Sequence, residues 1–238
     1  MNNNIKYIGI NQRIPFEVLD MSIHNYIDDG IINKEYVLQH IKEFTTGENR
    51  ALKSASHIIK ILKRNEKLIR KFKDSLSDFT YSQISIFDRK AFSLCLFCLT
   101  YPIAYELLVA FAKGFKVQNL LNRQFILLKM GAIYGGNRST FLAIDAIIPL
   151  LMEMDLLKRE KIGIYTLSSK LISSNRFISE LLVYVDIYLS DSKSILKDDL
   201  IHRPWYTYFE IPSQKFDNKS QLIKSTESAV GKGYLTIK

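Results

Sequence analysis

Apolar side chains recur along most of this 238-residue chain at intervals of three and four residues, which is the spacing of amphipathic helices. The pattern predicts a mainly α-helical protein. After a short extended start, we expect a helix over residues 15–27, a turn at Asp28-Asp29-Gly30 and a second helix over 33–44. Residues 45–48, Thr-Thr-Gly-Glu, then separate the second helix from a long basic helix over 50–75.

The most apolar segment covers residues 91–112 and contains a single charged side chain, Glu106. Its length is about that of a membrane-spanning helix. Thr100 and Pro102 interrupt it, however, and proline is poorly tolerated in the interior of a helix. We therefore expect two buried helices that meet near Tyr101 and Pro102, and no membrane span.

From Gly114 onward the pattern predicts shorter elements. A helix over 118–134 should end at Gly135-Gly136, and Asn137 or Ser139 should cap a second helix over 140–154. A β-hairpin is expected next, with strands at 156–158 and 162–167 and a charged turn at 159–161. A further helix over 175–189 should pack back on the body of the protein.

The order helix, turn, helix and hairpin over residues 117–167 resembles a winged-helix DNA-binding domain. In that family the start of the second helix and the hairpin, called the wing, contact DNA. The resemblance implies a DNA-contacting role for Arg138, Ser139 and Thr140 at the helix start, and for Lys158, Arg159 and Lys161 in the wing. The outward positions of the second helix offer no donor for a base edge, which favours low sequence specificity; they are Leu142, Ala143, Asp145, Ala146 and Pro149. The alternative is a winged helix that is buried or that pairs with another protein.

These patterns divide the chain into three predicted parts: a helical domain over 1–113, a winged-helix-like domain over 114–190 and an aromatic extension over 191–238. In the extension we expect a strand or extended arm over 202–212 and a short strand over 234–237. Its aromatic residues, which lie beside Arg203, could stack unpaired bases, or form a core edge or an intersubunit contact. They are Trp205, Tyr206, Tyr208 and Phe209.

Charge is concentrated in the basic helix. The chain carries a formal net charge of +9, and residues 50–73 alone contain nine Lys or Arg and one acid, Glu66. On a helix, five of these cations share one narrow face with His57: Lys53, Lys60, Arg64, Lys67 and Lys71. Together with Lys63, a further predicted nucleic-acid contact beside this face, we call them the basic stripe. The opposite face is apolar and should be core; it carries Leu52, Ala55, Ile58, Ile59, Leu62, Ile69 and Phe72.

A stripe of like charges destabilises its own helix, and this cost is easier to understand if an anionic partner binds there. Closely spaced phosphates suit such a surface because several cations bind at once and release condensed counterions. We therefore predict a protein that binds nucleic acid, DNA rather than RNA, through phosphates. The alternative is a protein-interaction subunit whose winged helix and basic face dock protein partners. A third reading places the basic helix on an anionic membrane, although Phe72 is the only aromatic residue of its apolar face.

No residue pattern indicates catalysis, a metal or a cofactor. Cys95 and Cys98 form a C-x-x-C inside an apolar run without a second ligand pair, and the four histidines are scattered, so we expect core cysteines in a reducing compartment. Catalytic and phosphate-loop motifs are absent. The first residues do not resemble a signal peptide. We expect a cytoplasmic protein that is not an enzyme.

A fainter resemblance takes in more of the chain. It rests on the order of a short helical start, the segment YIDDGIINKEYVLQHIKEF, the basic helix, the buried pair and NRSTFLAIDAIIPLLMEMDLLKRE. This order is similar to that of the small helical DNA-binding proteins (BrxA-like) of bacteriophage-exclusion (BREX) defence systems. The similarity implies a role beside DNA in an antiviral defence or regulatory complex.

Overall fold

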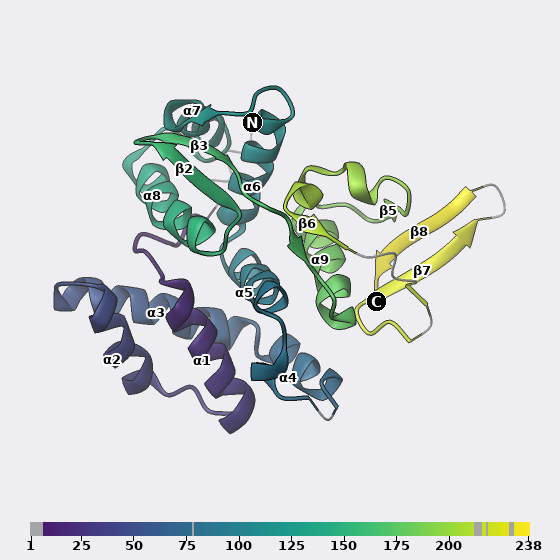
Figure 1. The fold of residues 1–238 in the computed structure, drawn as a ribbon, viewed down its shortest axis with the longest axis horizontal. Helices are drawn as coiled ribbons and strands as arrows, with labels where there is room; N and C mark the ends of the chain where they lie inside the picture. Colours follow the sequence, from purple (N-terminus) through teal and green to yellow (C-terminus); the bar gives the residue numbers. More distant parts are fainter. Residues whose placement is uncertain (1–6, 78, 212–215, 218, 229–230) are drawn as a thin grey trace.

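The computed structural model describes residues 7–77, 79–211, 216–217, 219–228 and 231–238, and it is mainly helical, as predicted. Figure 1 shows how the elements are arranged. The α-helices of this part are α1 (Phe16–Asp29), α2 (Lys34–Phe44), α3 (Glu48–Arg64), α4 (Glu66–Ser75), α5 (Ile86–Thr100), α6 (Pro102–Phe115), α7 (Arg123–Tyr134), α8 (Arg138–Glu153) and α9 (Arg176–Leu189). The strands are β1 (Leu121–Asn122), β2 (Leu157–Lys161), β3 (Ile164–Leu167), β4 (Leu171–Ile172), β5 (Ile195–Leu196), β6 (Phe209–Glu210), β7 (Ile223–Ser228) and β8 (Gly231–Ile237).

Helix α5 lies in the middle of the protein and packs against α1, α3, α6 and α9 (Figure 1). Every residue from Ala91 to Cys98 is buried, because neighbours cover all sides of the helix. This explains the apolar run: α5 and α6 are the expected buried pair, and they meet at 115° beside Tyr101. Within the described residues, no single helix has the length and apolarity that a membrane span requires; only this bent pair does when its two helices are taken together.

The segment after α6 differs from the prediction at its start. The predicted helix over 118–134 begins only at Arg123, because Leu121 pairs with Tyr165 in a sheet and the Asn122 side chain caps α7 by accepting from the Phe125 amide at 2.7 Å. The three strands are antiparallel in the order β1-β3-β2.

The hairpin turn also lies elsewhere than predicted. Residues 159–161 belong to β2, and the chain reverses at Ile162 and Gly163. Gly163 has a φ of +73°, a conformation that glycine adopts without strain. The turn is therefore located by Gly163, and not by the charged residues 159–161 on which its prediction rested.

The aromatic segment is core. The strand or arm predicted over 202–212 is instead two 3₁₀ turns, Leu200–His202 and Pro204–Thr207, followed by β6, which pairs in parallel with β4; Pro212 lies outside the described residues. Trp205 is fully buried and its Nε1 donates to the Leu182 carbonyl at 3.1 Å, while the Tyr208 hydroxyl donates to the Leu108 carbonyl at 2.8 Å. The core alternative is therefore confirmed, and these rings are not available to stack bases.

The strand predicted over 234–237 is the end of β8, which pairs with both β5 and β7. In Figure 1 the β7–β8 hairpin extends away from the helices at the end of the molecule beyond α9.

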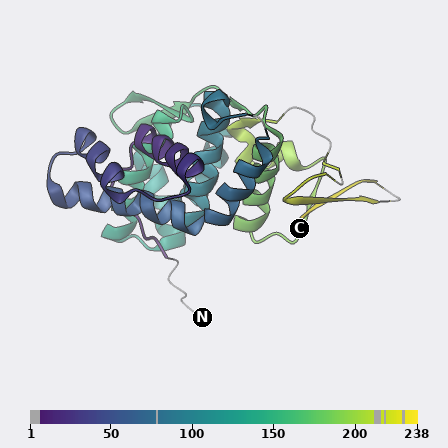
Figure 2. The same ribbon diagram turned by 90° about the horizontal axis from the view of Figure 1, so that it is seen from below.

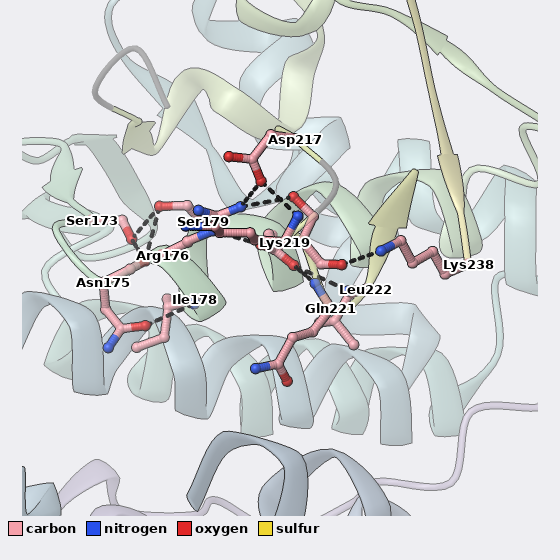
Figure 3. Close-up of polar contacts among 12 residues, drawn as sticks. Ser173, Asn175, Arg176, Ile178, Ser179, Asp217, Lys219, Gln221, Leu222 and Lys238 are labelled. Carbon is pink, nitrogen blue, oxygen red and sulfur yellow. Dashed lines mark hydrogen bonds and ion pairs between the residues drawn. The ribbon is translucent and has the colours of Figure 1, made fainter. Parts of the chain in front are cut away.

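A buried carboxylate ties this C-terminal part to α9. Glu180 is buried, accepts from Arg176 Nε at 3.2 Å, and accepts the backbone amides of Gln221 and Leu222 at 2.6 and 3.0 Å. Arg176 also pairs with Asp217, which lowers the pKa of that carboxyl (Figure 3). The negative charge of Glu180 thus has donors on two sides, as a buried ion requires.

Candidate nucleic-acid interface

The basic helix is not continuous. Helix α3 ends at Arg64, and α4 begins at Glu66. Asn65 lies between them, and its side-chain amide is buried. The amide Nδ2 donates to the Ile61 carbonyl at 2.8 Å, the Leu96 carbonyl at 3.0 Å and Thr100 Oγ1 at 2.9 Å. An asparagine that bonds to nearby backbone competes with helical geometry. The backbone bonds from Asn65 N to the Ile61 carbonyl and from Ile69 N to the Asn65 carbonyl persist, so the stripe continues across the interruption.

The buried side of the two helices agrees with the pattern except at its edge. Ala55, Ile58, Leu62, Ile69 and Phe72 are buried as predicted. Leu52, a predicted core residue, is 47% exposed, and Ile59 is only partly buried. The buried arc is rotated away from these two residues because Ala51, Ser54 and Ile61 occupy it instead.

His57 contributes no positive charge at neutral pH. Its Nδ1 lies 2.8 Å from the Tyr101 hydroxyl, and its Nε2 lies 3.3 Å from Asn11 Oδ1. Burial, aided by the nearby Lys60 ammonium, lowers the pKa of His57 to about 4. His57 shares the face of the basic stripe, as predicted, but it is a neutral polar contact.

Two cations of the basic stripe also touch the body of the protein. Lys60 Nζ donates to the Tyr7 hydroxyl at 2.6 Å and lies 5.3 Å from the centroid of the Tyr101 ring. Arg64 donates to the Thr100 carbonyl at 3.2 Å. Substituting either residue would disturb packing as well as charge.

The other four members of the basic stripe are exposed: Lys53, Lys63, Lys67 and Lys71. Within the described part of the chain, no acidic side chain lies within ion-pair distance of any of them; the acid of this segment, Glu66, pairs with Arg70. Four ammonium groups therefore face solvent without internal compensation, and anions can reach them.

The predicted DNA contacts at the start of α8 and in the wing include both exposed and buried residues. Arg138 and Ser139 are exposed in the first turn of α8, and Lys158, Arg159 and Lys161 are exposed along β2. Thr140 is fully buried, and its hydroxyl donates to the Gly135 carbonyl at 2.8 Å, so it closes the turn between α7 and α8. The cap of α8 is Asn137, which accepts from the Thr140 amide at 3.0 Å.

The outward side of α8 is apolar or internally paired. Leu142 is 42% exposed, whereas Ala143 and Ala146 are buried. Asp145 accepts two hydrogen bonds from Arg123 Nη2, at 2.7 and 2.9 Å. This side of the helix therefore presents no free cation to a polyanion within the residues that the structure describes.

The N-terminal segment joins the two surfaces, a connection that the sequence did not reveal. The Arg13 carbonyl accepts from Ser54 on α3 at 2.6 Å, and Arg13 Nε donates to Glu153 at the end of α8 at 3.1 Å. Arg13 and Glu153 also line an open cavity together with Arg159 of β2, so this segment lies near the wing as well. Seen from below in Figure 2, the purple and blue N-terminal helices lie in front of the rest of the chain. The basic stripe lies on α3 and α4 and the wing cations lie on β2, and the Arg13 segment connects these elements.

The two thiols lie in the core of the protein. Cys95 and Cys98 are fully buried in α5, and burial raises the pKa of both thiols. Among the residues that the structure describes, no three His, Cys, Asp or Glu side chains are grouped so as to hold a metal ion.

Comparisons with protein-family models, curated proteins and solved structures found no match to this chain.

Proposed function

We propose that this protein binds nucleic acid, duplex DNA rather than RNA, through phosphate contacts made chiefly by the basic stripe. The observation that carries the proposal is the set of four exposed lysines without an acidic neighbour among the described residues, at Lys53, Lys63, Lys67 and Lys71. Lys67 and Lys71 are four residues apart on α4, a rise of about 6 Å. Phosphates of one strand repeat about every 3.4 Å along the axis, so neighbouring lysines match roughly every second phosphate.

A winged-helix unit is the second part of the proposal. The order α6-β1-α7-α8-β2-β3 and the three-stranded sheet support it. In this unit Arg138 and Ser139 contact the backbone at the start of α8, and the exposed cations of β2 contact it from the wing. Since the outward positions of α8 carry Leu142 and the paired Asp145, we expect little sequence specificity.

The order of a basic helix, a buried helical pair and this unit supports extending the proposal to a DNA-bound component of a prokaryotic defence or regulatory complex. The extension concerns the setting of the protein, whereas the phosphate contacts concern its chemistry. The phosphate contacts can be tested on the purified protein, independently of any complex.

Fluorescence anisotropy with a labelled random-sequence duplex, at several salt concentrations, tests the proposed function. We expect the Lys53, Lys63, Lys67, Lys71 quadruple alanine variant to lose most of its affinity, with a salt dependence reduced by about 0.9 for each phosphate contact removed. The matched control removes the same charge from exposed lysines elsewhere, at Lys34, Lys170, Lys193 and Lys224. Absence of binding at low salt, or equal effects of the two quadruple variants, contradicts the proposal. Duplex RNA of the same sequence decides between the two polymers.

Exposed Leu142 favours a second candidate, a protein-interaction subunit that docks a partner on α8. In this case a stoichiometric partner should survive nuclease treatment and be lost on Leu142→Asp. The purified protein should then also ignore DNA.

A further inference from the structure

An open groove lies between α6 and α7, and none of its lining residues belongs to the basic stripe or to the predicted DNA contacts of α8 and β2. Its volume is about 610 Å³. One side of α6, the connection after it and one side of α7 line the groove; the lining includes Ala110, Lys113, Val117, Lys129, Ala132 and Ile133.

The two helices run antiparallel along the groove. A side chain at Gly114, near the end of α6, would meet Leu121 at 2.6 Å and Phe125 at 3.0 Å, so this end lies beside the start of α7. Burial raises the pKa of Tyr134 at the far end of α7, and the carboxylate of Glu106, earlier in α6, raises it further, so these two residues are near each other. Between these ends the small side chains of Ala110 and Ala132 leave the space open.

Most of the exposed surface of the groove is apolar. Val117 is 86% exposed, and Ile133 is 39% exposed. From Glu106 to Gly114 the groove follows about 12 Å of helix, at a rise of about 1.5 Å per residue. A groove of this length and character suits an amphipathic helix that inserts side chains at positions i, i+3, i+4 and i+7.

The charged residues of the groove indicate which charge the bound helix should carry. Lys113 and Lys129 are exposed members of its lining, and Glu106 is the one acidic residue of that lining. We propose that the groove binds an amphipathic helix of a protein partner, with apolar residues on one face and acidic residues beside them. A second copy of this chain, with a net charge of +9, fits a basic rim less well.

The probe is a displayed library of helical peptides of about 12 residues, roughly three turns, selected on the full-length protein. We expect enriched sequences with apolar residues at i, i+3 or i+4 and i+7, and with Asp or Glu between them. The consensus peptide should bind Ala132→Arg at least about tenfold more weakly, because the new side chain occupies the groove. It should also bind the double variant Lys113→Glu/Lys129→Glu at least about tenfold more weakly than it binds wild type. A peptide with Lys in place of each acid should show no such loss of affinity for the double variant.

The matched control is Gln124→Arg, which adds the same charge to an exposed position of α7 outside the groove and should leave peptide affinity within about twofold. Lack of enrichment, basic consensus peptides, or equal binding to wild type and Ala132→Arg overturns the proposal. So does a dimer in sedimentation that Ala132→Arg dissociates, since the occupant is then a second copy. Duplex DNA binding by Ala132→Arg should be unchanged, which separates this proposal from the proposed function.

Discussion

The basic stripe and the carboxylates of α9 show two opposite uses of charge. On α9, Glu180 and Asp186 are buried, and each has an arginine and further donors around it. On α3 and α4, four lysines are exposed, and none has an acidic partner among the described residues. The carboxylates of α9 are paired inside the protein and stabilise the fold. The four lysines have no internal acidic partner among the described residues, so they are available to bind an external anion.

The two regions should therefore respond to substitution in opposite ways. Removal of a buried carboxylate leaves its donors unpaired in a low-dielectric environment, which costs stability. Removal of an exposed lysine leaves nothing unpaired, so only binding should suffer.

Glu180→Ala should have the largest effect on stability. It removes the acceptor of Arg176 Nε and of the amides of Gln221 and Leu222, although Arg176 keeps Asp217. We expect a loss of about 2–4 kcal/mol in the free energy of unfolding, because the two amides are left without a partner. Urea denaturation followed by circular dichroism measures the change. The control is Glu227→Ala at an exposed site on β7. A loss below about 1 kcal/mol would show that Glu180 does not anchor the C-terminal segment.

Trp205→Phe should destabilise by about 1–3 kcal/mol, because it removes ring volume from the core and leaves the Leu182 carbonyl without its side-chain donor. Affinity for single-stranded DNA should not change in the folded variant. A selective loss of single-strand binding at unchanged stability would restore base stacking as the role of the aromatic cluster.

His57 should make stability depend on pH in a smaller, defined way. Between pH 6.5 and about 4, the unfolded chain binds a proton on this imidazole that the folded protein does not, because the folded pKa is lowered to about 4. Stability should therefore fall as the pH drops through this interval. Partial exposure limits the loss to about 1–2 kcal/mol. In a comparison of pH-dependent melting, His57→Gln should lose less stability than wild type; parallel curves would refute the assignment.

The quadruple alanine variant of the basic stripe should have the smallest effect on stability. Alanine favours helix, and removal of like charges relieves repulsion, so we expect the free energy of unfolding to change by no more than about 0.5 kcal/mol in either direction. A loss of several kcal/mol in urea denaturation would mean that the lysines are structural, which would remove the contrast with α9.

The sequence predicted local features well and long-range ones poorly. Helical spacing located α1, α2, α5 and α9, and Gly30 ends α1 in a left-handed conformation as its position in the turn suggests. It did not reveal the interruption at Asn65, because two of the three partners of that amide lie 31 and 35 residues away on α5. The donors of Glu180 on residues 221 and 222 are equally remote in the chain.

The same limit applies to the candidate sites. Periodicity placed the lysines of the basic stripe on one face, since that depends only on helical geometry. Whether Thr140 or Trp205 is exposed depends on tertiary packing, and both are fully buried. The α6–α7 groove arises from small side chains on two helices, and no single segment carries that signal.

The most direct test of the account compares the basic stripe with the wing in one experiment. Duplex DNA affinity is measured against salt for wild type, for the quadruple alanine variant of the stripe and for Lys158, Arg159, Lys161 triple alanine. We predict that the stripe variant loses about three to four units of salt dependence and most of the affinity. For the triple variant, we predict a smaller loss of affinity and of salt dependence for each charge removed. A triple variant that abolishes binding while the stripe variant binds like wild type would contradict the account.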